Sequence, residues 1–280
     1  MNVDLALLPV PDVIESIDYE DEFQDVLGRF REAMGDQWSA VLESDPVMKL
    51  LEQVAFLRVL TRARINDAAR SVLLASARGT DLDHVLALLD AKRLDGEGDS
   101  DFRARGRQAP YGFSTAGPGA AYRYHALSAS SDVRDARVDR PEPGLVRVAI
   151  LARSNGGVPS AELLALVQAH LSAEDIRPLN DTVQVVPATI VAYELRATIY
   201  VASGAAPEPL LLAAQAAAEG YTEKQFAIAA EVSESGLYAA LHQAGALRVE
   251  LMTPPGGIAS SPQQAPHCTR IVLDMVTDYV

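Results

Sequence analysis

The chain has 280 residues, 49% of them hydrophobic, and a formal net charge of −14. This composition supports folded cores rather than global disorder, and the length allows two or three domains. The acidic balance argues against nucleic acid as the main partner, because phosphate binding needs a basic field, whereas basic protein surfaces suit it.

Cysteine usage and the first residues indicate the compartment of synthesis. Cys268 is the only cysteine, so neither an intramolecular disulfide nor a cysteine metal cluster can form. The opening MNVDLALLPVPDVIESIDYEDEF lacks the basic region of a signal peptide, and no apolar run approaches the roughly 18 residues that span a bilayer. We therefore expect synthesis in a reducing cytoplasm and no membrane partner.

The first third of the chain is predicted to be helical. Asp18 is placed to cap a helix whose apolar residues recur at helical spacing up to Met34. Asp45-Pro46 begins a second helix with proline at its first position, and its pattern continues to Arg78. That helix would have about 33 residues and a length of roughly 50 Å, which suggests a bundle or coiled coil. Its apolar stripe comprises Leu50, Val54, Leu57, Ile65, Ala68 and Val72.

Short helices around an exposed turn are expected next. Thr80 and Asp83 have capping-box spacing and precede a short helix, DLDHVLALLD. The acidic stretch RLDGEGDSD is rich in turn residues, and a short helical segment, DSDFRARGRQAP, overlaps its end. We therefore predict a helical N-terminal region over 1–94 and a linker over 95–110.

The pattern then changes to alternating strands and helices. A helix over 120–129 is followed by two strands, DVRDARVDRP and GLVRVAILARS, joined by a Pro-Gly turn. Ser160 is placed to cap the next helix, and Pro187 divides the long apolar stretch DTVQVVPATIVAYELRATIYVAS. These elements predict a first small α+β module over 111–190.

A second α+β module is predicted over 191–280. A strand over 194–202 precedes helices over 209–218 and 235–243, and the strands ALRVELMTPP and TRIVLDMVTDYV follow. Both modules contain a helix–turn–strand segment and a strand–loop–helix segment, in swapped order, which suggests an internal duplication. The predicted fold class is α+β, with an N-terminal helical region that contains a long helix.

The stretch YGFSTAGPGAAYRYHALSAS raises the question of a phosphate-binding loop. Its candidate residues are Gly112, Ser114, Thr115, Gly117 and Pro118. A nucleotide- or phosphate-binding enzyme that uses the Gly-rich loop 112–119 is therefore the alternative function. Against it, no Lys follows the glycines, and their spacing is not that of a dinucleotide-binding fingerprint. The structural interpretation is that Ser114 or Thr115 caps the next helix, and that the glycines allow close packing.

The remaining reactive residues do not form a recognisable catalytic or metal motif. The five histidines form neither H-x-x-x-H nor H-E-x-x-H, and there is no G-x-S-x-G nucleophile motif. The acids and the histidine of DLDH follow one another on a helix, so they point in different directions. We therefore expect no enzyme activity, no catalytic residue, no metal and no cofactor.

The long predicted helix carries a basic strip within this acidic chain. Arg58 and Arg62 are four residues apart and share a helix face, so they either pair with the chain's own carboxylates or seat an acidic partner. Asn66 and Asp67 are poor helix formers in mid-helix and are candidates for setting register against a neighbouring helix. We predict that these four residues contribute to a helix–helix seat, within this chain or with a neighbouring one.

Three motifs carry a resemblance to a known family: RINDAAR at 64–70, GTDLDH at 79–84 and GFSTAGP at 112–118. With the flanking sequences LPVPDVIESIDYEDEF and GLYAALHQAGALRVEL, the similarity extends over nearly the whole chain. The chain resembles the baseplate assembly protein J family of contractile-tailed bacteriophages and R-type tail-like bacteriocins.

The resemblance implies a structural component of a baseplate wedge. Two copies would join one partner of the tail protein I family, and the wedges would form a ring around the hub and spike, with sheath-initiation proteins nearby. The ring would rearrange when the sheath contracts. The resemblance implies a place in the virion tail baseplate or a tail-like particle, with assembly in the bacterial host cytoplasm. It gives the Gly-rich loop the role of a hinge-like entry to the first module, with Tyr122 or Tyr124 packing the helix onto the sheet. A secretion-machine baseplate is a further alternative.

Overall fold

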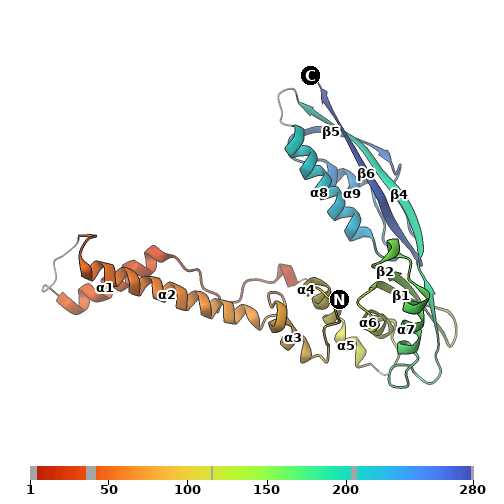
Figure 1. Ribbon diagram of the computed structural model, residues 1–280, viewed down its shortest axis with the longest axis horizontal. Helices are drawn as coiled ribbons and strands as arrows, with labels where there is room; N and C mark the ends of the chain where they lie inside the picture. Colours follow the sequence, from red (N-terminus) through yellow and green to blue (C-terminus); the bar gives the residue numbers. More distant parts are fainter. Residues whose placement is uncertain (1–4, 36–41, 115, 203–206, 279–280) are drawn as a thin grey trace. The chain divides into compact units, whose positions relative to one another are not determined.

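A computed structural model gives an α+β protein and describes residues 5–35, 42–114, 116–202 and 207–278 (Figure 1). This confirms the predicted fold class. The chain divides into two compact units, one over 1–93 with 98–106 and the other over 94–97 with 107–280. Each unit has its own packing and is described by itself. The finer predicted boundaries at 94, 110 and 190 stay predictions.

The first unit is helical. Its elements are the 3-10 turn η1 (Leu5–Leu7) and the helices α1 (Tyr19–Met34), α2 (Pro46–Ser71), α3 (Gly79–Ala87) and α4 (Asp99–Gly106). Helices α1 and α2 form a hairpin (Figure 1), and a small cluster that includes Val26, Leu27, Met48, Leu51 and Ala55 is buried between them. The helix starts follow the sequence, because Asp18 accepts hydrogen bonds from the backbone N–H groups of Glu20 and Asp21, and Asp45 from that of Val47.

The long helix is shorter than predicted, and this is a correction. It was expected to continue to Arg78, but α2 has 26 residues and ends at Ser71. Other donors satisfy the backbone at and beyond this end, because Ser76 Oγ donates to the carbonyl of Arg70, and the guanidinium of Arg103 in α4 donates to the carbonyls of Leu74 and Ala77. A carbonyl captured in this way satisfies the backbone without a further helical turn.

The predicted capping box at Thr80 is also wrong. Helix α3 starts at Gly79, with Arg78 at the cap position and no side-chain cap hydrogen bond. The Gly79 N–H is instead bound by the Asp99 carboxylate at 2.9 Å, a contact from 20 residues away that local spacing cannot reveal.

The second unit begins with α5 (Ala109–Gly112) and α6 (Gly119–Ala129) and contains two three-stranded sheets. The first sheet has the order β1 (Val133–Glu142), β2 (Leu145–Ala152), β3 (Thr182–Pro187). Strand β1 is antiparallel to β2, and β3 is parallel to it after a crossover through the turn η3 (Asn155–Gly157) and α7 (Ala161–Leu171). Helices α6 and α7 cover one face of this sheet and bury Tyr122, Val167 and Leu171. The prediction that Tyr122 packs the helix onto the sheet is confirmed.

The second sheet has the order β5 (Ala246–Thr253), β4 (Thr189–Ala202), β6 (Gln264–Asp278). Strand β4 is antiparallel to β5 and parallel to β6. Helices α8 (Pro207–Gln225) and α9 (Glu234–Leu241) lie on one face of it (Figure 1) and share its buried core. The predicted division of the strand region at Pro187 and the cap at Ser160 are both confirmed.

The two sheets have the same plan in a permuted chain order. Each places a central strand between an antiparallel and a parallel edge strand, with two helices packed on the sheet. In the first, the chain passes through α6 and β1 before the central β2 and α7. In the second, the central β4 and α8 come before α9 and β5. This is the swapped order expected from the sequence, and it supports the suggestion of a duplication.

Candidate protein interface on the helical hairpin

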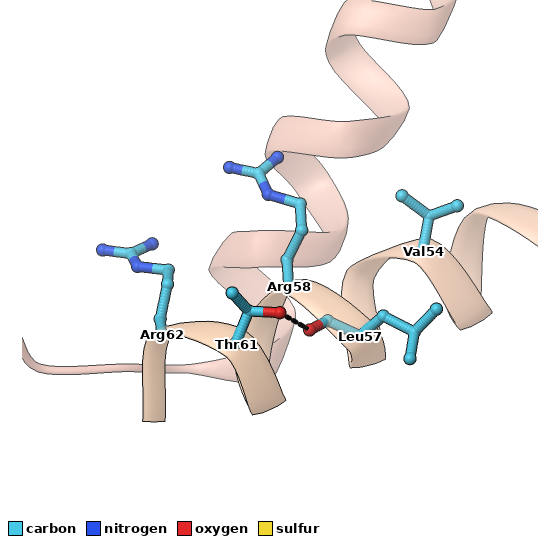
Figure 2. A pocket seen from close by; sticks show the side chains of 5 residues that line it. All are labelled: Val54, Leu57, Arg58, Thr61 and Arg62. Carbon is cyan, nitrogen blue, oxygen red and sulfur yellow. Dashed lines mark hydrogen bonds between the residues drawn. The ribbon is translucent and has the colours of Figure 1, made fainter. Parts of the chain in front are cut away.

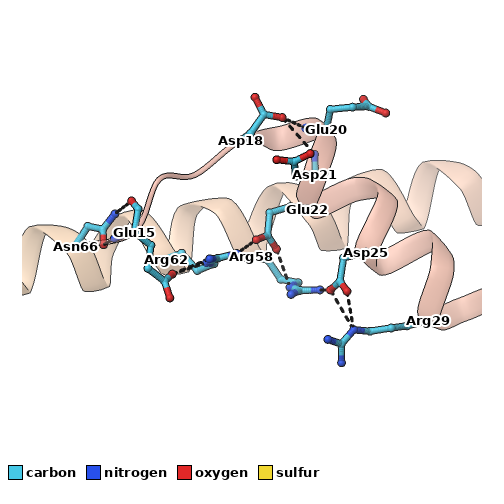
Figure 3. Close-up of polar contacts among 10 residues, drawn as sticks. All are labelled: Glu15, Asp18, Glu20, Asp21, Glu22, Asp25, Arg29, Arg58, Arg62 and Asn66. Carbon is cyan, nitrogen blue, oxygen red and sulfur yellow. Dashed lines mark hydrogen bonds and ion pairs between the residues drawn. The ribbon is translucent and has the colours of Figure 1, made fainter. Parts of the chain in front are cut away.

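The two predicted arginines of α2 lie in an ion-pair network with α1 and the segment before it (Figure 3). Arg58 Nε lies 3.1 Å from a Glu22 oxygen, and its Nη1 lies 2.6 Å from Asp25 Oδ2. Arg62 Nη2 lies 2.7 Å from Glu15 Oε2, and Nη1 contacts the other oxygen of Glu22. Of the two interpretations of the basic strip, the structure places the arginines on carboxylates of their own chain.

Glu22 is the centre of this network. The residue is only 4% exposed, and both of its oxygens contact an arginine. A buried carboxylate is costly unless it is paired, so the network fixes how α1 lies along α2. The hydrogen bond from Arg58, helped by Arg29, also holds the pKa of Asp25 below its usual value.

Asn66 and Asp67, although adjacent, have different environments. Asn66 is buried, and its amide exchanges two hydrogen bonds with the backbone of Glu15, at 3.1 Å to the N–H and 2.8 Å to the carbonyl. It therefore fastens the extended segment that leads into α1, rather than setting register against a helix. Asp67 is exposed, and Nη1 of Arg70 on its own helix lies 3.4 Å from its carboxylate.

The apolar stripe predicted for α2 faces away from α1. Leu50, Val54, Leu57 and Ile65 are between 46% and 65% exposed, whereas Met48, Leu51 and Ala55 make the contact with α1. A hollow of about 430 Å³ lies along the stripe, lined by Val54, Leu57, Arg58, Thr61 and Arg62 (Figure 2). Phe56 and Leu60 are also about half exposed, so apolar side chains extend around much of the helix. A helix with apolar groups on several sides is typical of a bundle with further members.

The Gly-rich loop is packed against its own module. Gly117 has a positive φ of 66°, and an added Cβ would lie 2.7 Å from Pro178 and 3.1 Å from an oxygen of Asp181. The same Asp181 accepts a 2.8 Å hydrogen bond from Tyr122 of α6. Both glycine freedom and close approach are therefore needed at Gly117, as the structural interpretation expected.

The predicted cap in this loop is wrong for Ser114, and Thr115 lies outside the described residues. Pro118 occupies the cap position of α6 and makes no side-chain cap hydrogen bond. Gly112 ends α5 and lies against Tyr124. The carboxylate of Asp181 beside Gly117 repels phosphate, so this geometry does not favour the alternative enzyme function.

Over 5–35, 42–114, 116–202 and 207–278, no group of three or more His, Cys, Asp or Glu side chains is arranged to hold a metal ion. No helix in those ranges combines the length and apolar character needed to cross a membrane.

Local sequence patterns did not identify the two carboxylates that complete the hairpin network, Glu15 and Glu22. The signal that identifies Glu22 is its place among the helical core positions, since it lies one turn before Val26 on the buried side of α1.

Known families and proteins resemble this chain in sequence. The Baseplate J-like N-terminal domain matches residues 43–95, and the Baseplate J-like central domain matches residues 114–187. Baseplate protein J of Escherichia phage P2 is 39% identical over 291 aligned positions, which cover 95% of each chain. A chain in the cryo-EM structure of the anti-feeding prophage baseplate aligns at 13% identity with a TM-score of 0.34. That alignment covers 90% of the present chain and 53% of the other.

Proposed function

Because the chain belongs to the baseplate J family, we propose that it is a structural component of a contractile tail baseplate wedge, and that the outer face of α2 seats another helix of that wedge. Family membership supports the baseplate role. The observation that carries the seat is the exposed apolar stripe of α2, from Leu50 through Val54 and Leu57 to Ile65.

The stripe has the chemistry of a helix–helix contact. Its residues recur at the spacing that aligns one helix face, and two of them, Val54 and Leu57, line the hollow beside Arg58 and Arg62. The two arginines are held by carboxylates of α1 and of the segment before it, so they form a fixed polar rim rather than two mobile charges. An apolar centre with a polar rim is the usual composition of a protein interface.

The proposal extends to the assembly that the family resemblance implies. The expected partners are a second copy of this chain, a protein of the tail protein I family, neighbouring wedges, and hub, spike and sheath-initiation proteins. The role is binding rather than catalysis. Contraction of the sheath would require two arrangements of the contacts between wedges. The particle would be assembled in the host cytoplasm and carry this chain in its tail baseplate.

The test is co-expression with the neighbouring open reading frames, followed by the mass of the purified complex. The wild-type chain is expected in a complex of two copies with one partner. The variant Val54→Asp/Leu57→Glu should lose the partner, because it places carboxylates in the apolar centre of the seat.

The matched control is Gln53→Asp/Arg70→Glu, which adds acidic groups at exposed polar positions of the same helix. This control should keep the partner. Equal retention by both variants would remove α2 as the seat, and a lone wild-type monomer in the presence of all partners would contradict the wedge itself.

A further inference from the structure

Strand β6 presents a long outer edge. It has 15 residues and pairs with β4 from Gln264 to Asp278, and the second sheet contains no strand on its other side among the described residues. Its backbone N–H and C=O groups on that side therefore have no ladder partner in this sheet. Such an edge is a template for pairing with another strand.

Two features that protect a sheet edge, a proline and a bulge, occur only near the start of β6. Pro266 lies near the beginning, and a bulge interrupts the pairing with β4 at Thr269. The remainder, RIVLDMVTD over 270–278, contains no Pro, Gly or Lys and is rich in β-branched and large apolar residues. An edge of this composition is normally covered, because it otherwise favours aggregation.

A groove lies beside this edge. It is lined by Gln215, Glu219, Thr222 and Glu223 of α8 and by residues 268–271 of β6. A groove between an edge strand and a helix is where extended segments add to a sheet, with backbone hydrogen bonds to the strand and side chains against the helix. The structure therefore offers both the edge and the room for an added strand.

We propose that the added strand is β6 of a second copy, paired antiparallel about a two-fold axis at Val272. In this register Arg270 lies opposite Asp274 of the second copy, and Asp274 opposite its Arg270. Both side chains are exposed on the face of the sheet away from α8. Opposite charges directly across an antiparallel pair stabilise it. The second sheet of one copy and the second sheet of the other would become one continuous sheet.

The charges select this register over its neighbour. An axis at Asp274 would allow a longer regular ladder beyond the bulge and would place Arg270 opposite Asp278, but it would also place the two Asp274 carboxylates directly opposite each other, which destabilises the pair. An axis at Val272 avoids this repulsion and places Arg270 and Asp274 of each copy opposite those of the other. It also directs the end of the second strand, at Met275 and Val276, along the groove beside residues 268 and 269.

The proposed wedge contains two copies of this chain, and the outer edge of β6 is the surface through which we expect them to pair. The β6 pairing rests on the proposed function for its biological setting alone. Its test uses the full chain without any partner. Each variant is made in the Val54→Asp/Leu57→Glu background, so that the α2 face does not contribute. A failure of the β6 test therefore says nothing about the seat on α2. Loss of the wedge partner in the co-expression test likewise says nothing about β6.

Sedimentation of the background chain should show a mass rising with concentration from 29.9 kDa towards twice that value. Arg270→Asp should weaken this association at least tenfold, and Asp274→Arg likewise, because each creates two like-charge contacts per dimer. An equimolar mixture of the two variants should associate again, since every cross-strand pair is then Asp–Arg. The double variant Arg270→Asp/Asp274→Arg should also associate by itself. A background chain that stays monomeric at all concentrations, or two variants that do not associate when mixed, would overturn the proposal.

Disulfide trapping gives a second measurement that does not depend on affinity. In a Cys268→Ser chain, Val272→Cys should form a covalent dimer under mild oxidation, because the two side chains meet at the axis. Val276→Cys is the control, since the two copies of that position would lie roughly 27 Å apart at about 3.4 Å per residue. Equal cross-linking of both variants would contradict the register.

Discussion

At the scale of single residues, Glu22 has the largest consequence for the hairpin. It lies on the buried side of α1, and its two oxygens contact Arg58 and Arg62 of α2. Reversal of both arginine charges would therefore weaken wedge assembly in two ways. It would alter the rim of the proposed seat, and it would also separate α1 from α2.

We expect Arg58→Ala to lower the free energy of unfolding by about 1–3 kcal/mol, because it leaves part of a buried carboxylate without its partner. Urea denaturation of the full chain measures this change. Replacing Glu22 with Ala in the same chain should return part of the loss, since the unpaired charge is then absent. The wild type, Arg58→Ala, Glu22→Ala and the double variant form a double-mutant cycle. A coupling energy near zero would show that the network does not hold the hairpin.

At the scale of secondary-structure elements, helices α6 and α7 carry an interacting histidine pair. The rings of His125 and His170 lie 6.0 Å apart. Burial lowers the pKa of both side chains, and the charge of His170 lowers that of His125 further, while the nearby Asp175 acts in the opposite direction. Both imidazoles are therefore held in the neutral form when the first sheet is packed.

The sign of the pH dependence follows from these shifts. Between the lowered folded pKa and the unfolded value of about 6.5, the unfolded chain binds more protons, so acidification favours unfolding. The contribution of the histidine pair to the free energy of unfolding should be constant above about pH 7 and should fall as the pH is lowered through about 6.5. His170→Gln should reduce this slope, measured by urea denaturation between pH 8 and 5. His84→Gln, in an exposed position of α3, should leave it unchanged. An unaltered slope in His170→Gln would contradict the role of the pair.

The elements also show which local signals were sufficient. Asp18 and Ser160 were predicted as caps and act as caps, because each binds backbone N–H groups within three residues of itself. The end of α2 and the start of α3 were wrong, because Arg103 and Asp99 reach them from distant positions. The apolar stripe of α2 was identified correctly as a stripe, but periodicity alone does not say whether a partner helix belongs to the same chain.

At the scale of the whole second unit, one arginine joins the two sheets. Arg134 of β1 donates 2.7 Å hydrogen bonds to the carbonyls of Phe226 and Glu223 and to the Glu223 carboxylate, and its guanidinium lies 4.6 Å from the centre of the Phe226 ring. The neighbouring Asp135 accepts a 2.9 Å hydrogen bond from the Ile228 N–H. The segment over 223–228, which the sequence analysis did not assign, thus fastens the second sheet to the first. No local pattern identifies it, because its partners are about 90 residues away in the chain.

We expect Arg134 to stabilise the contact between the two sheets of the second unit. Arg134→Ala removes three hydrogen bonds and the contact with the Phe226 ring, so we expect a loss of about 1.5–3 kcal/mol in the free energy of unfolding. Hydrogen exchange should become faster over 223–230 and remain unchanged in α7, because the core under α7 does not include this segment. Arg134→Lys should have an intermediate effect, since an ammonium group cannot reproduce the planar fork of donors. Arg137→Ala, exposed on the same strand, is the control. If exchange over 223–230 were as slow in Arg134→Ala as in the wild type, the packing of Ala149, Leu151 and Ile228 would hold the sheets together without the arginine.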